Sequence, residues 1–241
     1  MPAPGDVRDP AVRTMFDRIA DRYDLLNRII SMRLDKRWRR HAVAALIRCG
    51  RERLLDVGAG TGDLSFAAAD RLGSEGCVVA LDFSARMLER ARAKLPRAAS
   101  RKKVRLVQAS GLALPFRGGV FDGVMSAFVL RNVSDLGLFF AEAFRVLKPG
   151  GALVSVDMFP PDNALFTGLY GVYFHRLMPR IAALISADAG AYRYLSESVK
   201  RFDPPEAVSR RMIESGFESV SLKKFLCGAV CLHAARKPSA P

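Results

Sequence analysis

The chain has 241 residues, half of them hydrophobic, and its formal net charge at pH 7 is +14. A chain of this length and composition can bury a sizeable core, which excludes an intrinsically disordered protein and favours a single α/β enzyme unit. The four cysteines are too few and too scattered for a disulfide framework, so we interpret them as small apolar residues in a reducing cytoplasm. We expect no signal peptide, because residues 1–9 lack an apolar run, and no membrane-spanning helix, because the apolar stretch at 164–174 is too short.

Two helices are predicted in the N-terminal part of the chain. Residues 9–24 carry Phe16, Ile19, Ala20 and Tyr23 as an apolar stripe at helical spacing. A second helix is expected over about 35–47. We expect residues 1–48 to form a helical cap and residues 49–241 to form the unit that carries the chemistry.

The most informative stretch follows this cap. An apolar run ends in Asp56, the three glycines Gly58, Gly60 and Gly62 alternate with small residues, and a helical pattern begins at Asp63. This pattern predicts a strand, a tight turn and a helix start, where bare backbone lets a ligand approach and free N–H groups attract an anion. A dinucleotide fingerprint would place its third glycine at position 63, so the motif is of a different type.

A second strand, predicted at 77–82, also ends in a carboxylate, that of Asp82. An acid at this place accepts hydrogen bonds from the ribose hydroxyls of a nucleotide-type cofactor. The alternative is that Ser84 caps the following helix, 85–95, while Asp82 is a solvated strand end. The two motifs in succession favour a nucleotide-type site.

The remaining elements alternate in type. Strands are predicted at 103–109, 120–128 and 152–157, a helix at 135–147, and a helix stop with a turn at 148–151. Residues 160–200 interrupt the alternation of strands and helices and are expected to form an inserted helical cap over the substrate. A helix near 204–215 and strands at 218–226 and 229–236 complete the chain. The predicted fold class is α/β: a mostly parallel seven-stranded sheet with helices on both faces and a C-terminal antiparallel hairpin.

Two basic segments, 33–41 and 86–105, contribute much of the positive charge. They are interpreted either as solvated helix faces or as a surface that attracts an anionic bilayer or nucleic acid. Composition alone does not distinguish these interpretations of the basic segments.

Several further motifs resemble those of the ubiquinone/menaquinone biosynthesis C-methyltransferase family. They are residues 14–41, 54–64, 114–116, 121–122, 128–133, 145–151 and 192–198. The glycine motif and its neighbours are shared by many methyltransferases, whereas 14–41, the Arg131-Asn132 pair and 192–198 are more specific. The resemblance covers about residues 12–237.

The resemblance implies a Rossmann-like class I methyltransferase that uses S-adenosylmethionine (AdoMet) and no metal. Its substrate would be a lipophilic, prenylated quinol that is methylated at a ring carbon. The residues implied in cofactor binding are Asp56, Gly58, Gly60, Thr61, Gly62, Asp82, Phe83, Met87, Ser110, Gly111 and Ser126.

Catalysis of this kind needs a cation near the quinol oxygen and a proton acceptor. We assign phenolate stabilisation to Arg131, because guanidinium does not deprotonate in proteins, and orientation of the ring or of water to Asn132. Alternatively, Arg131 is structural and pairs with an acid such as Asp135. The candidate acceptors, which the sequence does not rank, are Asp157, His175 and Tyr192, while Tyr170, Tyr173 and Phe174 are candidates for a prenyl tunnel and His233 is interpreted as a packed core residue.

One position departs from the family pattern. The resemblance implies an acid after the third strand that accepts from the adenine amino group, and this chain has Ser110 there. A hydroxyl can still accept a hydrogen bond, but without the strength that charge adds.

Other functions stay open at this stage. A nucleic-acid methyltransferase would suit the basic charge, but residues 126–132 lack the Asn/Asp-Pro-Pro-Tyr/Phe turn typical of base amino methylation. A methyltransferase of another small aromatic compound and a non-catalytic AdoMet-binding homologue are the further alternatives. We expect a cytoplasmic enzyme in peripheral contact with an anionic membrane, and a homodimer is left open.

Overall fold

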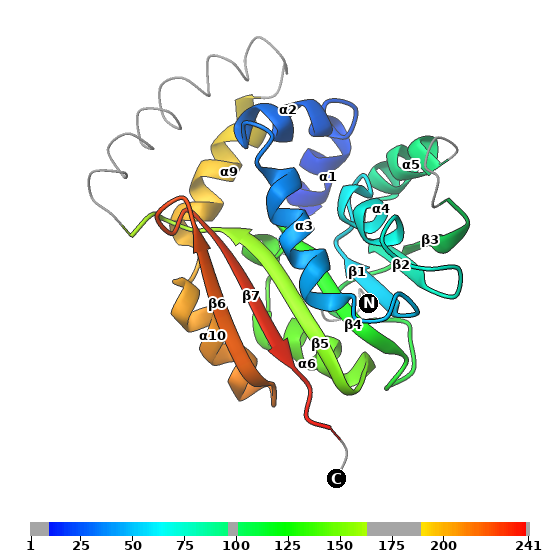
Figure 1. Cartoon of the computed structure of the whole chain (residues 1–241). Helices are drawn as coiled ribbons and strands as arrows, with labels where there is room; N and C mark the ends of the chain where they lie inside the picture. The colour runs from blue at the N-terminus through cyan, green and yellow to red at the C-terminus, as the bar shows by residue number, and fades with distance from the viewer. Residues whose placement is uncertain (1–9, 96–100, 163–188, 240–241) are drawn as a thin grey trace.

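A seven-stranded sheet forms the centre of the molecule (Figure 1). The computed structural model describes residues 10–95, 101–162 and 189–239. The strand order is β3-β2-β1-β4-β5-β7-β6. The strands are β1 Arg53–Val57, β2 Cys77–Asp82, β3 Val104–Gln108, β4 Phe121–Ala127, β5 Leu147–Met158, β6 Glu218–Phe225 and β7 Val230–Arg236.

The first five strands are parallel, and the last two form an antiparallel hairpin at one edge, with β7 paired to β5. The predicted fold class is confirmed. Parallel strands all end at the same edge of the sheet, so the glycine turn after β1 and Asp82 at the end of β2 lie next to each other.

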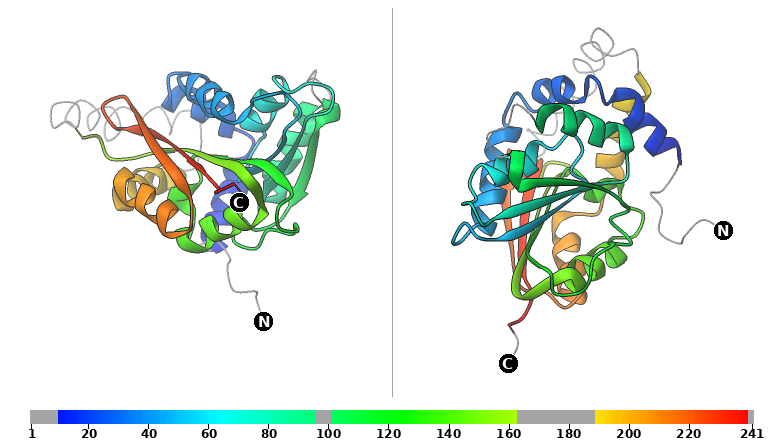
Figure 2. Two further views of the ribbon diagram at one scale, coloured as in Figure 1. Left: turned by 60° about the horizontal axis from the view of Figure 1, so that its bottom comes forward. Right: turned by 90° about the vertical axis from the view of Figure 1, so that its right-hand side faces the viewer.

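Helices cover both faces of the sheet (Figure 2). The helices α3 Asp35–Leu46 and α4 Asp63–Ala69 pack on one face, and α6 Leu136–Val146 and α10 Pro205–Glu214 on the other, while α5 Ala85–Lys94 lies along β2 and β3. Successive strand residues point to opposite faces, so in β1 Leu54 joins the core under α3 and α4 whereas Leu55 joins the core under α6 and α10. Side chains of α3 itself, including Trp38 and Val43, are part of the first of these cores.

The single helix predicted at 9–24 is wrong. The structure has α1 Pro10–Ile19 and α2 Tyr23–Ile30, separated by a turn at 20–22 in which the Arg22 N–H donates to the Ile19 carbonyl at 2.9 Å. Apolar periodicity does not reveal such a bend, because apolar residues recur at helical spacing on both sides of it.

The turn predicted at 148–151 is instead part of β5. The pairing of β4 with β5 passes from Phe121–Leu147 to Gly123–Ala152, so extra residues of β5 bulge out of the ladder. Gly150 adopts a φ of +73° within this bulge, and its N–H donates to the carbonyls of Lys237 and Pro238, both at 3.1 Å. The Lys-Pro-Gly-Gly sequence therefore bends a strand rather than separating a helix from it.

The remaining described elements are two 3₁₀ turns and one helix. Two 3₁₀ turns are η2 Arg101–Lys103 and η3 Leu130–Asn132, and α9 spans Ala189–Arg201. The candidates Tyr170, Tyr173, Phe174 and His175 fall outside the described residues. Within 10–95, 101–162 and 189–239, no helix is both long and apolar enough to cross a membrane.

The core under α6 gives a stability prediction. Phe140 is fully buried, whereas Leu138 on the same helix is 37% exposed. We expect Phe140→Ala to lower the free energy of unfolding by about 3–5 kcal/mol through loss of burial and creation of a cavity. Leu138→Ala is the matched control and should change it by less than about 1 kcal/mol. Equal effects in urea unfolding would contradict this packing.

Candidate active site

The turn after β1 is shaped by its glycines. Gly58, Gly60 and Gly62 have φ of +75°, +55° and +87°, a region that favours glycine. The N–H groups of Gly58 and Ala59 donate to the Leu81 carbonyl at 2.8 and 2.9 Å, which ties the turn to the end of β2. A Cβ on Gly58 would come within 2.5 Å of Val129, so no larger residue fits there.

Asp82 is buried behind this turn. Its carboxylate accepts from the N–H of Gly60 at 2.7 Å and from the N–H of Ser84 at 2.9 Å. Burial raises the pKa of Asp82 to about 6. The Ser84 hydroxyl caps α5 by accepting from the Met87 N–H at 3.1 Å, so the capping alternative is confirmed, but Asp82 is not a solvated strand end.

A pocket lies over these groups at the carboxyl edge of the sheet. Of the predicted site residues, those that line it are Gly58, Gly60, Asp82, Phe83, Met87, Ser110, Gly111 and Asn132. Apolar side chains, among them Val57, Leu112 and Phe128, form the rest of its wall.

Four residues predicted to bind the cofactor are not among those lining the pocket. Asp56 is fully buried and accepts from the Ser65 hydroxyl at 2.6 Å, which joins β1 to α4, and burial raises the pKa of Asp56 to about 7. Thr61 donates to Asp24 at 2.5 Å. Gly62 packs against Phe66, and Ser126 donates to Ser155 at 3.1 Å between β4 and β5. Asp56, Thr61 and Ser126 therefore join neighbouring elements of the fold rather than line the pocket.

The N-terminal helices, expected to form a cap, close one side of the pocket, and the contacts that hold them there could not be read from the sequence. Phe16 and Tyr23 line it. Ser84, at the start of α5, donates its hydroxyl hydrogen to Asp17 at 2.5 Å, and Lys94, at the end of α5, contacts Asp24 at 2.6 Å and Asp63 at 2.8 Å. Asp17, Asp21 and Asp24 are spaced by four and three residues in the sequence, so they lie where the end of α1, the turn and the start of α2 can reach α5.

These ion pairs change the interpretation of the basic segment 86–105. Arg86 and Arg90 both pair with Asp21, and Lys94 pairs with Asp24. Part of this charge therefore holds α1 and α2 onto α5.

Arg131 has a buried partner different from the one expected. Its Nη1 donates to Asp157 at 2.7 Å and to the Phe128 carbonyl at 2.9 Å, while Asp135 instead caps α6 by accepting from the Leu138 N–H. The Arg131 and Asp157 side chains are 7% and 0% exposed. The Arg131 Nε is buried without a hydrogen-bond partner, so the guanidinium keeps donor capacity.

Asn132, the next residue, is held from two sides. Its Nδ2 donates to the Phe128 carbonyl at 3.2 Å, and its Oδ1 accepts from the Tyr194 hydroxyl at 3.1 Å. Tyr194 lies on α9, two positions after the candidate Tyr192, whose side chain is outside the described part of the structure. The predicted motif 192–198 thus contributes to the site through Tyr194.

Two other predicted residues have defined environments. The Ser110 hydroxyl accepts from the Leu112 N–H at 3.2 Å, so it helps to fix the loop beside the pocket. His233 is fully buried against the Phe159 ring, and its Nε2 lies 2.9 Å from the Pro205 carbonyl oxygen. This confirms His233 as a packed core residue.

A second hollow of about 490 Å³ lies beside the first, between α1 and α9. Its wall includes Met15, Arg18, Arg131, Val133 and Tyr194. Val133 lines both hollows, so the segment around η3 separates them. The second hollow is within the size range of small-molecule pockets.

Residues 5–237 match the ubiE/COQ5 methyltransferase family. The chain belongs to this family. Demethylmenaquinone methyltransferase of Thermus thermophilus is 44% identical over 93% of this chain and 100% of its own length. The ubiquinone/menaquinone biosynthesis C-methyltransferase UbiE of a Marinomonas species is 38% identical over 95% of this chain and 92% of its own.

Solved structures agree on the fold. A SAM-dependent methyltransferase from Thermotoga maritima, described as a possible histamine N-methyltransferase, superposes with a TM-score of 0.63 at 20% identity, covering 93% of this chain and 98% of that chain. The ubiE/COQ5 member described here is therefore an AdoMet-dependent methyltransferase with a class I fold.

The residues of the pocket fit AdoMet. Asp82 offers a carboxylate to two ribose hydroxyls, and a Cβ added to Gly60 would have only Tyr23, at 3.9 Å, within 4 Å, so the backbone is open to a ligand there. Phe83, Met87 and Leu112 form an apolar slot suited to adenine, and the rings of Phe16 and Tyr23 suit a sulfonium cation. No group of three metal-binding side chains occurs among the described residues.

The buried carboxylate of Asp82 predicts a pH dependence of cofactor binding. Only the ionised form accepts from both hydroxyls, so AdoMet affinity should fall as the pH drops below about 6, by at most roughly tenfold per pH unit. Asp82→Asn should bind AdoMet more weakly and lose this dependence in calorimetry between pH 5 and 8. An unchanged pH profile in that variant would assign the titration to another group.

The contact between α2 and α5 predicts a kinetic effect. Lys94→Met removes the cation shared by Asp24 and Asp63, so the N-terminal helices should be held less firmly and AdoMet should dissociate faster, on the order of threefold to fivefold. Arg92→Met is the control, because it removes the same charge from an exposed position of α5. Stopped-flow dissociation rates that are equal in the two variants would contradict a closing role for α1 and α2.

Proposed function

We propose that the protein transfers the methyl group of AdoMet to a ring carbon of a prenylated quinol in quinone biosynthesis. Relatives named demethylmenaquinone methyltransferase and UbiE, matched over nearly their whole length, support this reaction class. The observation that carries the proposal is the buried guanidinium of Arg131 in the wall of the second hollow, which adjoins the first pocket at Val133.

The reaction sets clear demands on the protein. AdoMet, when bound, supplies an electrophilic methyl group on its sulfonium. The protein must align the acceptor carbon with it, exclude water, and favour the phenolate form of the quinol, in which that carbon is most nucleophilic. A fixed cation beside the phenolate oxygen meets the last demand.

Arg131 is suited to be that cation. Asp157 and the Phe128 carbonyl hold one end of the guanidinium, and no hydrogen bond within the described residues uses Nε or Nη2. A donor that is already oriented in a site of low exposure stabilises developing negative charge without reorganising. Arg131 therefore stabilises the phenolate, and Asn132, oriented by Tyr194, positions the ring.

Asp157 is better suited to hold Arg131 than to accept the quinol proton. Its side chain is fully buried, and its oxygens accept from Arg131 Nη1, from the Met158 N–H at 2.8 Å and from the Arg131 N–H at 3.4 Å. A carboxylate that is fully buried and already engaged by three N–H donors is not accessible to an incoming substrate. His175 and Tyr192 remain the candidate acceptors.

The second hollow is the proposed acceptor site. It borders Arg131 directly and shares Val133 with the cofactor pocket, so a ring bound in it lies next to the methyl donor. Its wall combines apolar side chains such as Met15 and Leu130 with polar groups such as Tyr194, as a quinol with an apolar tail requires. Such an enzyme would work in the cytoplasm at the membrane that holds the quinol.

Arg131 and Tyr194 yield a catalytic prediction. Arg131→Lys keeps the charge but loses the planar fork, so kcat should fall by roughly 100-fold while AdoMet affinity changes little. Tyr194→Phe removes only the hydroxyl that orients Asn132, and kcat should fall by about tenfold with an unchanged Tm. If kcat falls only in proportion to the folded fraction, Arg131 and Tyr194 are merely structural.

The substrate is tested by direct assay. The purified protein, labelled AdoMet and short-chain quinols of the benzene and naphthalene series should give a C-methylated product with at least one ring. Mass spectrometry of the quinone pool after deletion of the gene should show the matching unmethylated quinone. Tight AdoMet binding without transfer to either ring would reject the proposal.

A further inference from the structure

We propose that a basic apolar surface at the α2 end of the molecule docks on an anionic phospholipid bilayer. This surface is defined by Leu25, Arg28, Met32, Arg33, Lys36, Arg37, Arg40, Lys223 and Leu226. The proposal goes beyond the methyl transfer itself and does not depend on which acceptor is used.

The apolar part of this surface is the outer side of α2 and the turn that follows. Leu25 is 48% exposed and Met32 is 64% exposed, while Leu26 on the inner side of α2 is buried. Met32 and Arg33 adopt φ of +49° and +63°, an unusual conformation for such side chains that the turn between α2 and α3 imposes. Large apolar side chains that stay exposed, one of them at a strained turn, indicate an interaction surface.

The charge around these side chains is mostly positive, and the carboxylate of Asp162 beside the hairpin tip is paired with Lys224 at 2.9 Å. Arg28, Arg33, Lys36, Arg37 and Arg40 are exposed, and none pairs with a carboxylate among the described residues. The acid nearest in sequence, Asp35, is buried and paired with Arg39 at 3.5 Å. The cations of α5 differ, because Asp21 and Asp24 neutralise them.

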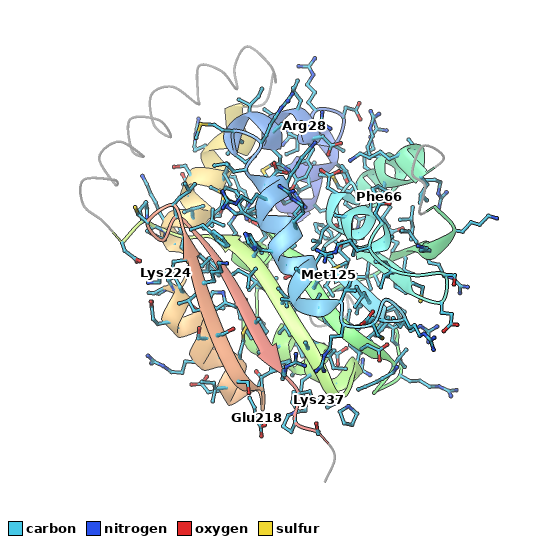
Figure 3. The ribbon with its side chains drawn as sticks, in the orientation of Figure 1. Arg28, Phe66, Met125, Glu218, Lys224 and Lys237 are labelled. Carbon is cyan, nitrogen blue, oxygen red and sulfur yellow. The ribbon has the colours of Figure 1, made fainter. Side chains whose placement is uncertain are left out.

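The tip of the β6–β7 hairpin extends the same surface. The ring of His41 on α3 lies 5.4 Å from that of Phe225, which is followed by Leu226, itself 38% exposed. Burial, with further contributions from Lys223, Arg37 and Arg40, lowers the pKa of His41, which shows that these cations crowd one place. Figure 1 shows α2, the start of α3 and the hairpin tip at one end of the molecule, and Figure 3 places Arg28 at this end, opposite Glu218 and Lys237.

Aliphatic side chains ringed by cations match the interface of an anionic bilayer. The aliphatic groups enter the boundary between headgroups and acyl chains, and the cations are attracted to anionic lipid. Single-stranded nucleic acid would instead favour exposed aromatic rings for base stacking, and the exposed large hydrophobic side chains here are aliphatic.

Sedimentation with vesicles tests this surface on the full-length protein. We expect binding to vesicles of 70% phosphatidylcholine and 30% phosphatidylglycerol that weakens steeply between 50 and 500 mM salt, and little binding to pure phosphatidylcholine. Met32→Asn with Arg37→Gln should weaken binding at least tenfold, since each lost cation alone accounts for about fivefold. Asparagine tolerates the positive φ of position 32, so this variant should fold.

A matched variant on α10 is the control. Ile213 is 59% exposed and Arg210 is exposed, so Ile213→Asn with Arg210→Gln makes the same chemical change elsewhere. Equal losses in the two variants, equal binding to neutral vesicles, absence of vesicle binding, or binding only to a 20-nucleotide RNA would each overturn the proposal. Turnover of a water-soluble short-chain quinol should be unchanged in both variants, so failure here is distinguishable from failure of the proposed function.

Discussion

The buried carboxylate of Asp82 is the interaction on which the rest of the site depends. It accepts from Gly60 in the turn after β1 and from Ser84 at the start of α5, so one side chain fixes both loops that frame the pocket. Ser84 in turn donates to Asp17 of α1, which extends the same chain of contacts to the N-terminal helices. Burial disfavours the ionised carboxylate and raises the pKa of Asp82 to about 6, so hydroxyl donors of a bound ligand would favour its ionised form.

The second organising contact is the pair between Arg131 and Asp157. Asp157 comes from β5, an inner strand that pairs with β4 and β7, so the guanidinium of Arg131 is tied to the sheet itself. Breaking such a buried pair leaves an uncompensated charge, so removing the Arg131 guanidinium should destabilise the fold. The structural and catalytic interpretations of Arg131 are therefore compatible, because the ion pair is what orients the remaining donors.

Charge has three separate uses in this molecule. The cations of α5 bind α1 and α2 across the cofactor pocket, and Arg131 is neutralised within the core. The exposed cations of α2, of the following turn and of the start of α3 have no carboxylate partners among the described residues and form a basic surface. A net charge of +14 alone does not distinguish these uses, since it counts charges without their neighbours.

The sequence by itself determined the sheet, the glycine turn, Asp82 and the Arg131-Asn132 pair. The strand limits 53–57 and 77–82 were predictable because a short apolar run followed by a segment of helical periodicity is a local feature of the sequence. The tertiary structure alone decided that Asp157 rather than Asp135 pairs with Arg131, that Tyr194 orients Asn132, and that Asp17 and Asp24 reach α5. It also decided that Ser126 and Asp56 join neighbouring elements of the fold rather than line the pocket. Apart from Asp56 and Ser65, these partners are 26 to 70 residues apart in the sequence. Which side chains meet over such separations depends on how the elements pack, and no local pattern encodes that.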